Sequence, residues 1–375
     1  MITRRLFLKQ TLNAGIAFSC GLVNTGCSGL KRSDITGTMS ADSGISLLDP
    51  VSRSILHHAS LAPSGHNSQP WRVRIERPDL WIIEVDRDRC LPAVDPKNRE
   101  LLLSIGAFSE NLVLAAGNLG VRTDITVTAT DFHDREVLRV DMYKGNSTGY
   151  PLERLKLRRT IRKGMISKEL ASSDLSILSA GEDSRFFYFP GDSSHGGCIR
   201  DLALESFCKQ SCRDSAQAEL IQWLRLSDKD SLLRRDGLTV EGMEIKGLKG
   251  WFVRHFVNPG DFMKESFRRQ GEDVMEDLVQ EGGGWIVMTS PGEKPADLIE
   301  TGRRFERMAL LAREAGIGIH PMSQILEEES GLTELAVQHG GSFFPQFVLR
   351  VGYCSAYPEP VSLRRPVAWF TDVAG

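Results

Sequence analysis

Two segments of this chain repeat each other without a gap, 196 positions apart. Residues 106–121 and 302–317 carry glycine, glutamate, leucine, alanine and glycine at the same five places. Both have the small-residue face and the terminal glycine of a helix. Strand-like apolar stretches flank both copies in the same order, at residues 81–83 and 285–287 before them and at 137–140 and 348–351 after them. We therefore predict a duplicated body with the two helices packed on each other; the alternative is two unrelated amphipathic helices.

Length and charge fit a body of this kind. The chain has 375 residues, of which 41% are hydrophobic and 25% charged, and a net charge of −3. Without a leader of about 30 residues, this length suits two domains or one large duplicated domain. The near-neutral balance lacks the basic footprint of a nucleic-acid-binding protein.

The first 27 residues predict export. Arg4 and Arg5 stand in a stretch typical of twin-arginine signals, and an apolar run follows at residues 14–23. That run is too short and too interrupted to span a bilayer as a helix. The alternative is an amphipathic helix. Because the twin-arginine route carries folded proteins, the signal suits a chain that folds in the cytoplasm, and we expect the protein in the periplasm or cell envelope.

Lipidation at the end of this leader is left open by the residues themselves. Cys27 follows a glycine, as at lipoprotein cleavage sites, but Asn24 stands where such sites usually carry leucine. Residues 28–46 are rich in serine, glycine and threonine, and we interpret them as a linker.

A loop between two prolines is the first candidate site. Pro63 ends a helical pattern and Pro70 fixes an extended exit into a strand. Between them, Asn67 and Gln69 each carry an amide donor and acceptor. Such amides can hold a planar heterocycle edge that alternates C=O and N–H, as the pyrimidine end of a flavin does. Alternatively, they cap the backbone of their own loop.

A run of cations is the second candidate site. The turn-rich residues 145–151 predict a boundary near residue 150, and the stretch 158–163 follows directly. Arg158 and Arg162 offer planar guanidinium groups and Thr160 a hydroxyl, which together suit a phosphate dianion. The alternative is a solvated charged face.

Both stretches resemble one family. Residues 62–71 are similar to the A-P-S-x-x-N-x-Q-P-W signature of the FMN-dependent nitroreductase superfamily, above all to the Acg-like branch, in which one chain carries two nitroreductase-like halves. Residues 158–162 resemble the R-R-S/T-x-R segment that opens the nitroreductase domain and grips the FMN phosphate. The resemblance implies an α+β fold with halves at 47–150 and 151–375, each with three αβα layers around a mixed, mainly antiparallel sheet.

The resemblance also implies one FMN per chain, held by residues of both halves. The implied ligands are Pro63, Ser64, Gly65, Asn67 and Gln69 from the first half, and Arg158, Thr160, Arg162, Pro321, Met322, Ser323, Gln324 and Arg364 from the second. Residues 321–324 would pass the flavin N5, where Ser323 and Gln324 replace the Glu-Gly of many relatives. Ser362 stands where the family often has a lysine. His320 lies beside this segment, either near the flavin or satisfied locally.

The implied function is that of an exported FMN-dependent oxidoreductase. Hydride would pass from a reduced nicotinamide through the flavin to a nitroaromatic, quinone or similar acceptor, and no side chain need act as a nucleophile. A membrane or periplasmic donor is the alternative to NAD(P)H, which is chiefly cytoplasmic. The competing functions are an FMN-sequestering or storage protein, and flavin-dependent dehalogenation or dehydrogenation. Residues 227–284 have no repeat counterpart and are either a lid over the flavin or a surface excursion.

Other motifs do not appear in the sequence. There is no G-x-G-x-x-G after a strand, no G-x-S-x-G and no histidine spacing of a metal site. Five cysteines remain beyond the leader, which is not a disulfide framework. Cys208 and Cys212 share a helical face without further ligands, so we predict no metal. We expect a pseudo-dimeric monomer whose partners are a small-molecule acceptor and the export machinery.

Overall fold

The computed structural model describes residues 48–179, 183–338 and 344–374. The predicted signal with Arg4, Arg5 and Cys27, and the linker 28–46, lie outside the described residues.

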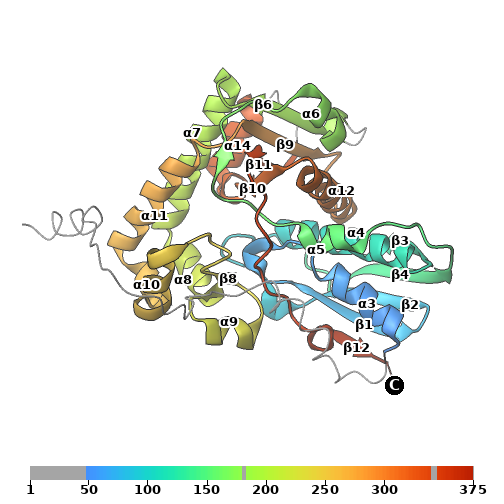
Figure 1. Ribbon diagram of the computed structural model, residues 1–375. Coiled ribbons are helices and arrows are strands. Elements are labelled where there is room, and N and C mark those ends of the chain that lie inside the picture. Colours follow the sequence, from blue (N-terminus) through green and yellow to red (C-terminus); the bar gives the residue numbers. More distant parts are fainter. Residues whose placement is uncertain (1–47, 180–182, 339–343, 375) are drawn as a thin grey trace, which may run out of the picture.

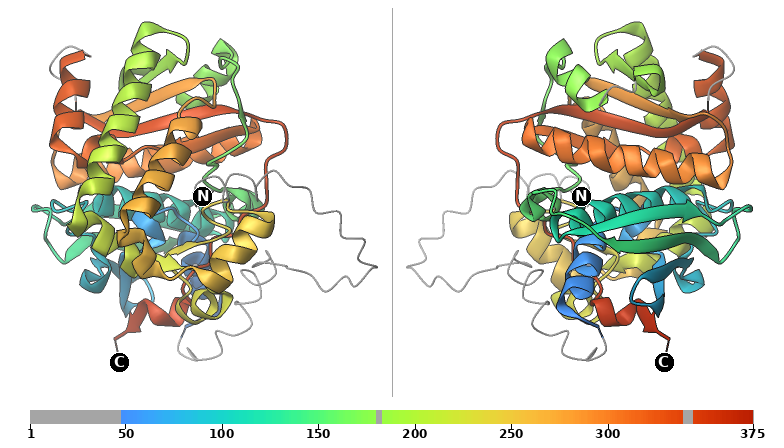
Figure 2. Two further views of the ribbon diagram at one scale, coloured as in Figure 1. Left: turned by 90° about the vertical axis from the view of Figure 1, so that its left-hand side faces the viewer. Right: turned by 90° about the vertical axis from the view of Figure 1, so that its right-hand side faces the viewer.

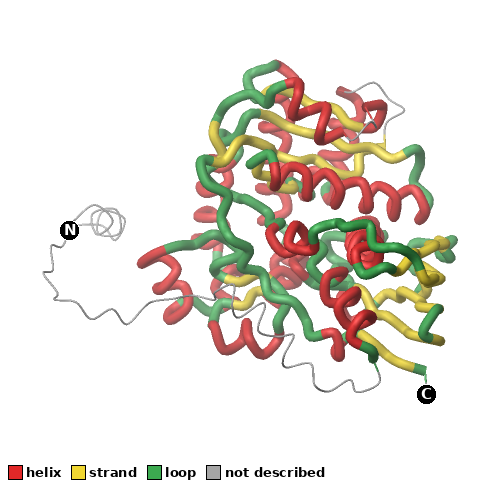
Figure 3. Tube along the Cα trace, turned by 45° about the vertical axis from the view of Figure 1, so that its right-hand side comes forward, coloured by secondary structure: helices red, strands yellow, loops and turns green. Residues whose placement is uncertain are grey.

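Two main sheets form the body, one above the other in Figures 1 and 3. The first sheet has the order β12 (Thr371–Val373), β1 (Trp71–Arg77), β2 (Leu80–Val85), β4 (Glu136–Lys144), β3 (Val121–Val127). The second has the order β10 (Ile317–Pro321), β11 (Phe344–Cys354), β9 (Gly284–Ser290), β6 (Phe186–Pro190), with β5 (Met165–Ile166) also on β11. Within these two sheets, only the β1–β12 pairing is parallel among the described strands. The predicted α+β class with mainly antiparallel sheets is confirmed.

The two sheets repeat one plan. The order β1-β2-β4-β3 in the first sheet corresponds to β6-β9-β11-β10 in the second. The long helices also correspond, because α4 (Arg99–Asn118) and α12 (Pro295–Glu314) each have 20 residues and keep the 196-residue offset of the sequence repeat at both ends. The duplication predicted from the sequence is therefore confirmed.

The helices α4 and α12 lie against each other between the two sheets (Figure 2). A Cβ atom on Gly106 would lie 2.2 Å from the carbonyl oxygen of Ile299, and one on Gly302 would lie 2.1 Å from that of Leu103. No side chain fits at such distances, so the repeated glycines allow the backbones to meet. Among the described helices, α4 alone is long and apolar enough to cross a membrane, and 78% of its apolar window is buried inside the protein.

Helices cover both faces of the second sheet. On one face, α12 and α6 (Ser172–Ser179) bury a core that contains Phe305, Ile286 and Leu349. On the other face, α7 (Ser194–Cys212), α11 (Glu265–Leu278), α13 (Gln324–Glu327) and α14 (Glu329–Gln338) cover Trp285 and Val348. The expected three layers form here.

The first sheet differs from this expectation. Its inner face carries Trp71 and Trp81, which pack with Phe108 of α4 and with α3 (Pro50–Ala59) in one core. Along β1, every second residue points to the outer face and is charged. On that face Arg74 pairs with Glu84 and Glu136. An ion-paired face of this kind is stable in water, so the described part of the first half has two layers and the three-layer prediction is wrong for it.

The two halves differ most in the connection between β6 and β9, the strands that correspond to β1 and β2. β1 and β2 are joined by a short turn at residues 78–79, but β6 and β9 are joined by residues 191–283, which we call the excursion. It contains α7, α8 (Asp214–Trp223), β7 (Leu224–Arg225), α9 (Asp228–Arg234), β8 (Leu238–Thr239), α10 (Gly247–Phe256) and α11. The excursion descends along one side of the molecule from the second sheet toward the first (Figure 1). The excursion begins at residue 191 and not at the predicted residue 227. The prediction missed its first part because the sequences of α7 and α8 look like those of ordinary helices of a repeated half.

The C-terminal segment does not belong to the second half, although the sequence analysis placed all of residues 151–375 there. After β11 the chain returns to the first half, where β12 pairs with β1 and aligns Thr371 with Val73. The final residues therefore belong to the first sheet and not to the half that begins at residue 151. The helix α5 (Leu152–Leu157) lies near the crossing point and contacts α3, α4 and α12.

Candidate functional site

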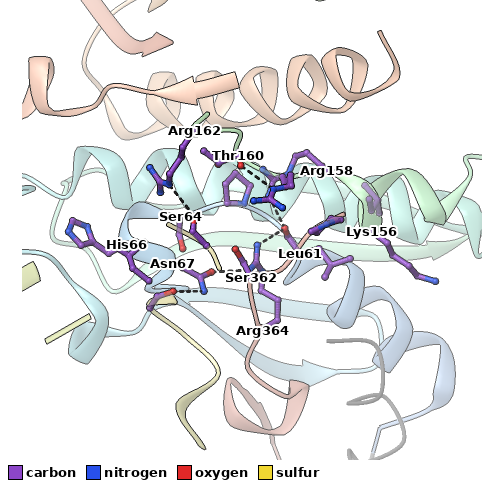
Figure 4. A pocket seen from close by; sticks show the side chains of 17 residues that line it. Leu61, Ser64, His66, Asn67, Lys156, Arg158, Thr160, Arg162, Ser362 and Arg364 are labelled. Carbon is purple, nitrogen blue, oxygen red and sulfur yellow. Dashed lines mark hydrogen bonds between the residues drawn. The ribbon is translucent and has the colours of Figure 1, made fainter. Parts of the chain in front are cut away.

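Two adjoining cavities lie between the halves. A smaller one of about 100 Å³, the cationic cavity, is lined by the stretches 61–67, 155–162 and 360–364. A second one of about 270 Å³, the large cavity, is lined by the loop 63–66, α4, α12 and the segment 320–324. Ser64, Thr160 and Arg162 line both, so the cavities meet there (Figure 4).

All the predicted site residues except Gln69 line one or both cavities. These are Pro63, Ser64, Gly65, Asn67, Arg158, Thr160, Arg162, Pro321, Met322, Ser323, Gln324 and Arg364. The structure thus brings the two halves of the predicted site together, and the role of each residue as a cofactor ligand stays a prediction.

The loop after α3 has a constrained backbone. His66, Asn67 and Gln69 have φ angles of 51°, 53° and 55°, in the left-handed region. Such angles are uncommon outside glycine and asparagine and need support from surrounding contacts. One support is local, since the backbone N–H of Gln69 donates to Ser64 Oγ at 2.9 Å.

The Asn67 amide is bound by the chain. Its Nδ2 donates to the carbonyl oxygens of Gly237 (3.1 Å) and Leu363 (3.3 Å). Its Oδ1 accepts from Arg364 at 2.9 Å. Asn67 therefore joins three segments at the wall of the cationic cavity, and its amide is not offered to a heterocycle in this structure. The capping alternative is closer to what is seen, although the capped groups lie far along the chain.

Gln69 requires a correction. Its fully buried side chain donates from Nε2 to the Arg235 carbonyl oxygen at 2.9 Å, and Oε1 accepts from the backbone N–H of Arg365 at 2.8 Å. It lines neither cavity. The left-handed turn at this residue directs the amide toward the excursion and the C-terminal segment, so Gln69 fixes the wall and does not face a ligand.

The cationic cavity is strongly positive. Lys156, Arg158, Arg159, Arg162 and Arg364 line it, and none of its described lining residues is acidic. Glu306 and Glu244, which pair with Arg158 and Arg159, are not among the residues that line it. A cavity with this charge attracts an anion, and guanidinium groups bind phosphate oxygens with good geometry.

Two of these arginines are oriented by buried carboxyl groups. Arg158 Nε lies 3.2 Å from Glu306 Oε1, and an Arg159 N–H donates to Glu244 Oε1 at 2.8 Å. Burial raises the pKa of Glu306, and the Arg158 charge opposes that rise. The ion pairs hold the guanidinium groups in place at the edge of the cavity.

A histidine that lines the large cavity contacts Arg162, which lines both cavities. His320 Nε2 lies 3.0 Å from Arg162 and its Nδ1 lies 3.1 Å from Arg350. Burial, followed by the charges of both arginines, holds the pKa of His320 well below its usual range. Burial and the Arg162 charge also lower the pKa of His66 to about 4. Both rings are therefore neutral at pH 7, and the positive charge of the site resides on the arginines.

The large cavity contains a carboxyl pair that sequence patterns did not indicate. Glu100, in the first turn of α4, lines it and is hydrogen-bonded to Glu327. Burial and the charge of Glu327 raise the pKa of Glu100 well above its usual range, and burial raises the pKa of Glu327. Gln210 donates to Glu327 Oε2 at 2.5 Å. Two carboxyl groups in such contact favour the sharing of a proton, because the charge of one opposes ionisation of the other.

The excursion forms part of the cavity walls. Gly237, Leu238 and Gly242 line the cationic cavity, and Phe207, Gln210 and Met275 line the large one. These residues were also missed from the sequence, because no motif marks them.

The excursion is bound to both halves. The Gly237 N–H donates to the Asn67 carbonyl oxygen, Asp236 pairs with Arg89, and Glu244 accepts from the backbone N–H groups of Arg162 and Lys163. The excursion is thus fixed against the walls of the site, and its role as a lid stays a prediction.

The described residues contain no group of three or more His, Cys, Asp or Glu side chains that could hold a metal ion. Their five cysteines, Cys90, Cys198, Cys208, Cys212 and Cys354, are free thiols.

Comparisons with known proteins connect this site to named relatives. No protein-family model matches the chain. It is 24% identical over 334 residues to the "Putative NAD(P)H nitroreductase acg" of Mycobacterium tuberculosis, covering 84% of this chain and 94% of that protein. It is 22% identical over 312 residues to the "Probable NAD(P)H nitroreductase PigM" of a Serratia strain, covering 78% and 86%. The chain is thus similar, over most of its length, to proteins that carry nitroreductase names.

The solved structures that match are more distant. The FMN-dependent nitroreductase NfnB of Mycobacterium smegmatis, solved with NADPH, is 8% identical, with a TM-score of 0.34, and the match covers 56% of this chain and 92% of that one. A nitroreductase-like protein of Bacillus cereus is 14% identical, with a TM-score of 0.34 and coverage of 59% and 94%.

Proposed function

We propose that this protein is an FMN-dependent oxidoreductase of the nitroreductase type. The observation that carries the proposal is the joining of a cationic cavity, without acidic lining residues, to a larger cavity between the halves. Supporting it are relatives with nitroreductase names that match the chain over most of its length.

The donor set fits the phosphate end of FMN. Arg158, Arg162 and Arg364 would hold the phosphate by charge-assisted hydrogen bonds, with Thr160 supplying a hydroxyl. The ring system would lie in the large cavity, between the loop 63–65 and residues 321–324. Asn67 and Gln69 do not fit as ligands of the pyrimidine edge, because their amides are bound to the chain.

FMN would supply hydride transfer when bound. The chain contributes position, exclusion of water and a proton store. Apolar walls of the large cavity would keep water from the reacting atoms. These walls are formed by Leu103 and Ala107 of α4, Phe305 of α12 and the buried Met322. Glu100 holds a proton in the same cavity. We assign the acceptor to the nitroaromatic and quinone class.

The electron donor and the location form part of the proposal. NAD(P)H is the proposed donor, and a membrane or periplasmic donor takes its place if the chain is exported. Export by the twin-arginine route rests on Arg4 and Arg5, and a lipid anchor on Cys27, all from the sequence alone. The chain with both arginines replaced by lysine should remain in the cytoplasm and still carry FMN; accumulation of this variant in the periplasm would contradict the export proposal.

Anaerobic titration of the purified protein with NADPH tests the reaction. Loss of the oxidised flavin absorbance, followed by its return on adding a quinone, is the expected result. An FMN-sequestering protein is the second candidate, favoured by the excursion residues that wall both cavities. Reduction by dithionite but not by NADPH would favour sequestration or another donor, and absence of any bound flavin would contradict both.

A further inference from the structure

The outer face of α10 is apolar and exposed. Leu248, Phe252 and Phe256 follow one another at a spacing of four residues, so they share one face of the helix. They are 86%, 53% and 59% exposed, and Trp251 beside them is 38% exposed. The Phe252 and Phe256 rings stack with centroids 5.2 Å apart, and Trp251 and Phe256 are 5.5 Å apart. We call these four residues the aromatic patch.

The inner face of α10 fixes this orientation. Val253, and Val257 just past the helix, pack with Val240 in a small core of the excursion. A Cβ atom on Gly250 would lie 2.5 Å from the Ile245 carbonyl oxygen, so the first turn of the helix packs closely on the residue that precedes its N-cap. The aromatic patch is therefore held outward by packing on the opposite side and cannot turn inward without separating this core.

The α10 segment itself carries positive charge and no negative charge. Residues 246–256 contain Lys246, Lys249, Arg254 and His255 and no carboxylate. Arg254 is paired with Glu241 and Asp228, whereas Lys246 and Lys249 are exposed beside the patch. An exposed aromatic face flanked by lysines has the composition of a helix that lies in the interface of an anionic bilayer.

We propose that α10 docks on an anionic lipid surface, with the aromatic patch in the headgroup region and Lys246 and Lys249 on lipid phosphates. Tryptophan and phenylalanine at this depth contribute apolar burial, and the lysines add electrostatic attraction that salt weakens. The inference does not depend on the proposed reaction. Docking would place the cavities near the lipid surface. The reason is that α10 belongs to the same excursion as Gly237, Leu238 and Gly242, which line the cationic cavity.

The test uses the full chain with Cys27→Ser, so that acylation plays no part, and vesicles of phosphatidylcholine with or without phosphatidylglycerol. The F252S/F256S variant should bind the anionic vesicles about tenfold or more weakly in co-sedimentation. The I166S/I177S variant is the matched control, since it removes two exposed apolar side chains from β5 and α6. It should bind like the parent chain, and K246E/K249E should lose the salt-dependent part of the binding.

A local measurement separates α10 from the leader, which all these variants share. Brominated lipids should quench the fluorescence of Trp251, so that the W251F variant loses the quenched component. Equal quenching in parent and W251F would overturn the proposal, as would vesicle binding that survives F252S/F256S. A parent chain that is dimeric in gel filtration and becomes monomeric in F252S/F256S, without vesicle binding, would assign the patch to protein contact instead.

Discussion

The two halves share a scaffold but supply different chemistry at the same place. In the first half, the loop after α3 carries Pro63 to Gln69 and leads into β1; in the second, the stretch after α5 carries Arg158 to Arg162 and leads toward β6. The first-half loop supplies amides that fix the wall of the site through hydrogen bonds to the chain, and the second-half stretch supplies guanidinium groups that line the cationic cavity. Among the described residues, the cations of this cavity come from the second-half stretch and from Arg364 of the C-terminal segment, so we expect the duplicated fold to have one anion-binding cavity and not two.

The symmetric part of this comparison is tested by the glycines at the helix contact. Gly106→Ala and Gly302→Ala should each reduce the free energy of unfolding by about 1–3 kcal/mol or more, because each new Cβ overlaps a carbonyl oxygen of the opposite helix. Urea denaturation measures the loss. Gly260→Ala, with no atom within 4 Å of its added Cβ, should be neutral. If the two alanine variants lost very different free energies of unfolding, the two glycines would not make equivalent contacts.

The first-half loop should act through stability. Gln69→Leu leaves the Arg235 carbonyl and the Arg365 N–H without their buried partner, which should cost about 1–3 kcal/mol for each unsatisfied group. Thermal unfolding measures this loss. Once folded, the variant should keep its flavin absorbance spectrum. A changed flavin spectrum at unchanged stability would restore Gln69 as a ligand.

The second-half stretch should act through cofactor retention. Arg162→Ala removes a charge-assisted partner of the proposed phosphate, worth about 1.5–3 kcal/mol, or roughly 10- to 150-fold in the FMN dissociation constant. Equilibrium dialysis of the purified proteins measures the change. Arg139→Ala, which removes an exposed arginine on the first sheet, is the control and should bind FMN like the parent. Full retention by Arg162→Ala through gel filtration would remove the phosphate assignment.

A smaller effect should appear in the pH dependence of stability. The pKa of Glu100 is raised on folding, so the native state binds this proton more tightly than the unfolded state. Its contribution to stability is therefore present in acid and is lost as the pH rises above the unfolded value and through the folded pKa. Glu100→Gln should flatten the decline of the melting temperature in that window, whereas Glu136→Gln, on the exposed face of the first sheet, should not. Parallel profiles for Glu100→Gln and the parent would contradict the shared proton.

His66 should change the pH dependence of stability in the direction opposite to Glu100, because its pKa is lowered and not raised. Burial lowers the pKa of His66 to about 4, below the usual 6.5, so its contribution to stability is present above pH 6.5 and is lost as the pH falls from there to about 4. His66→Asn should reduce the acid-side decline of the melting temperature. An acid limb unchanged in this variant would show that His66 is accessible to protons in the folded state.

Patterns in the sequence predicted those features that repeat or follow local rules. The duplicated helices were found because Gly106 and Gly302 occupy equivalent places, and the cationic cavity because Arg158 and Arg162 stand together. The direction of a side chain is not local. Gln69 fits the family motif, but its partners belong to Arg235 and Arg365, which only the tertiary fold brings near.

The same limit applies to the large cavity. Glu100 is one acidic residue in a helix first turn, a common place for a carboxylate, and its partner Glu327 lies in the other half. Nothing in the spacing of the two residues predicts their contact. The prediction that residues 151–375 all belong to the second half also fails at β12, because three residues after a 3₁₀ turn carry no information about which sheet edge they join.

The return of the C-terminal segment sets an order of events during synthesis. The first sheet lacks its β12 edge until residue 373 has left the ribosome, although its other strands lie between residues 71 and 144. The same segment brings Arg364 to the cationic cavity and Arg365 to Gln69. A nascent chain that stops short of this segment has neither the complete first sheet nor the complete cationic cavity, so we expect the proposed cofactor to bind only after the segment has joined the first half.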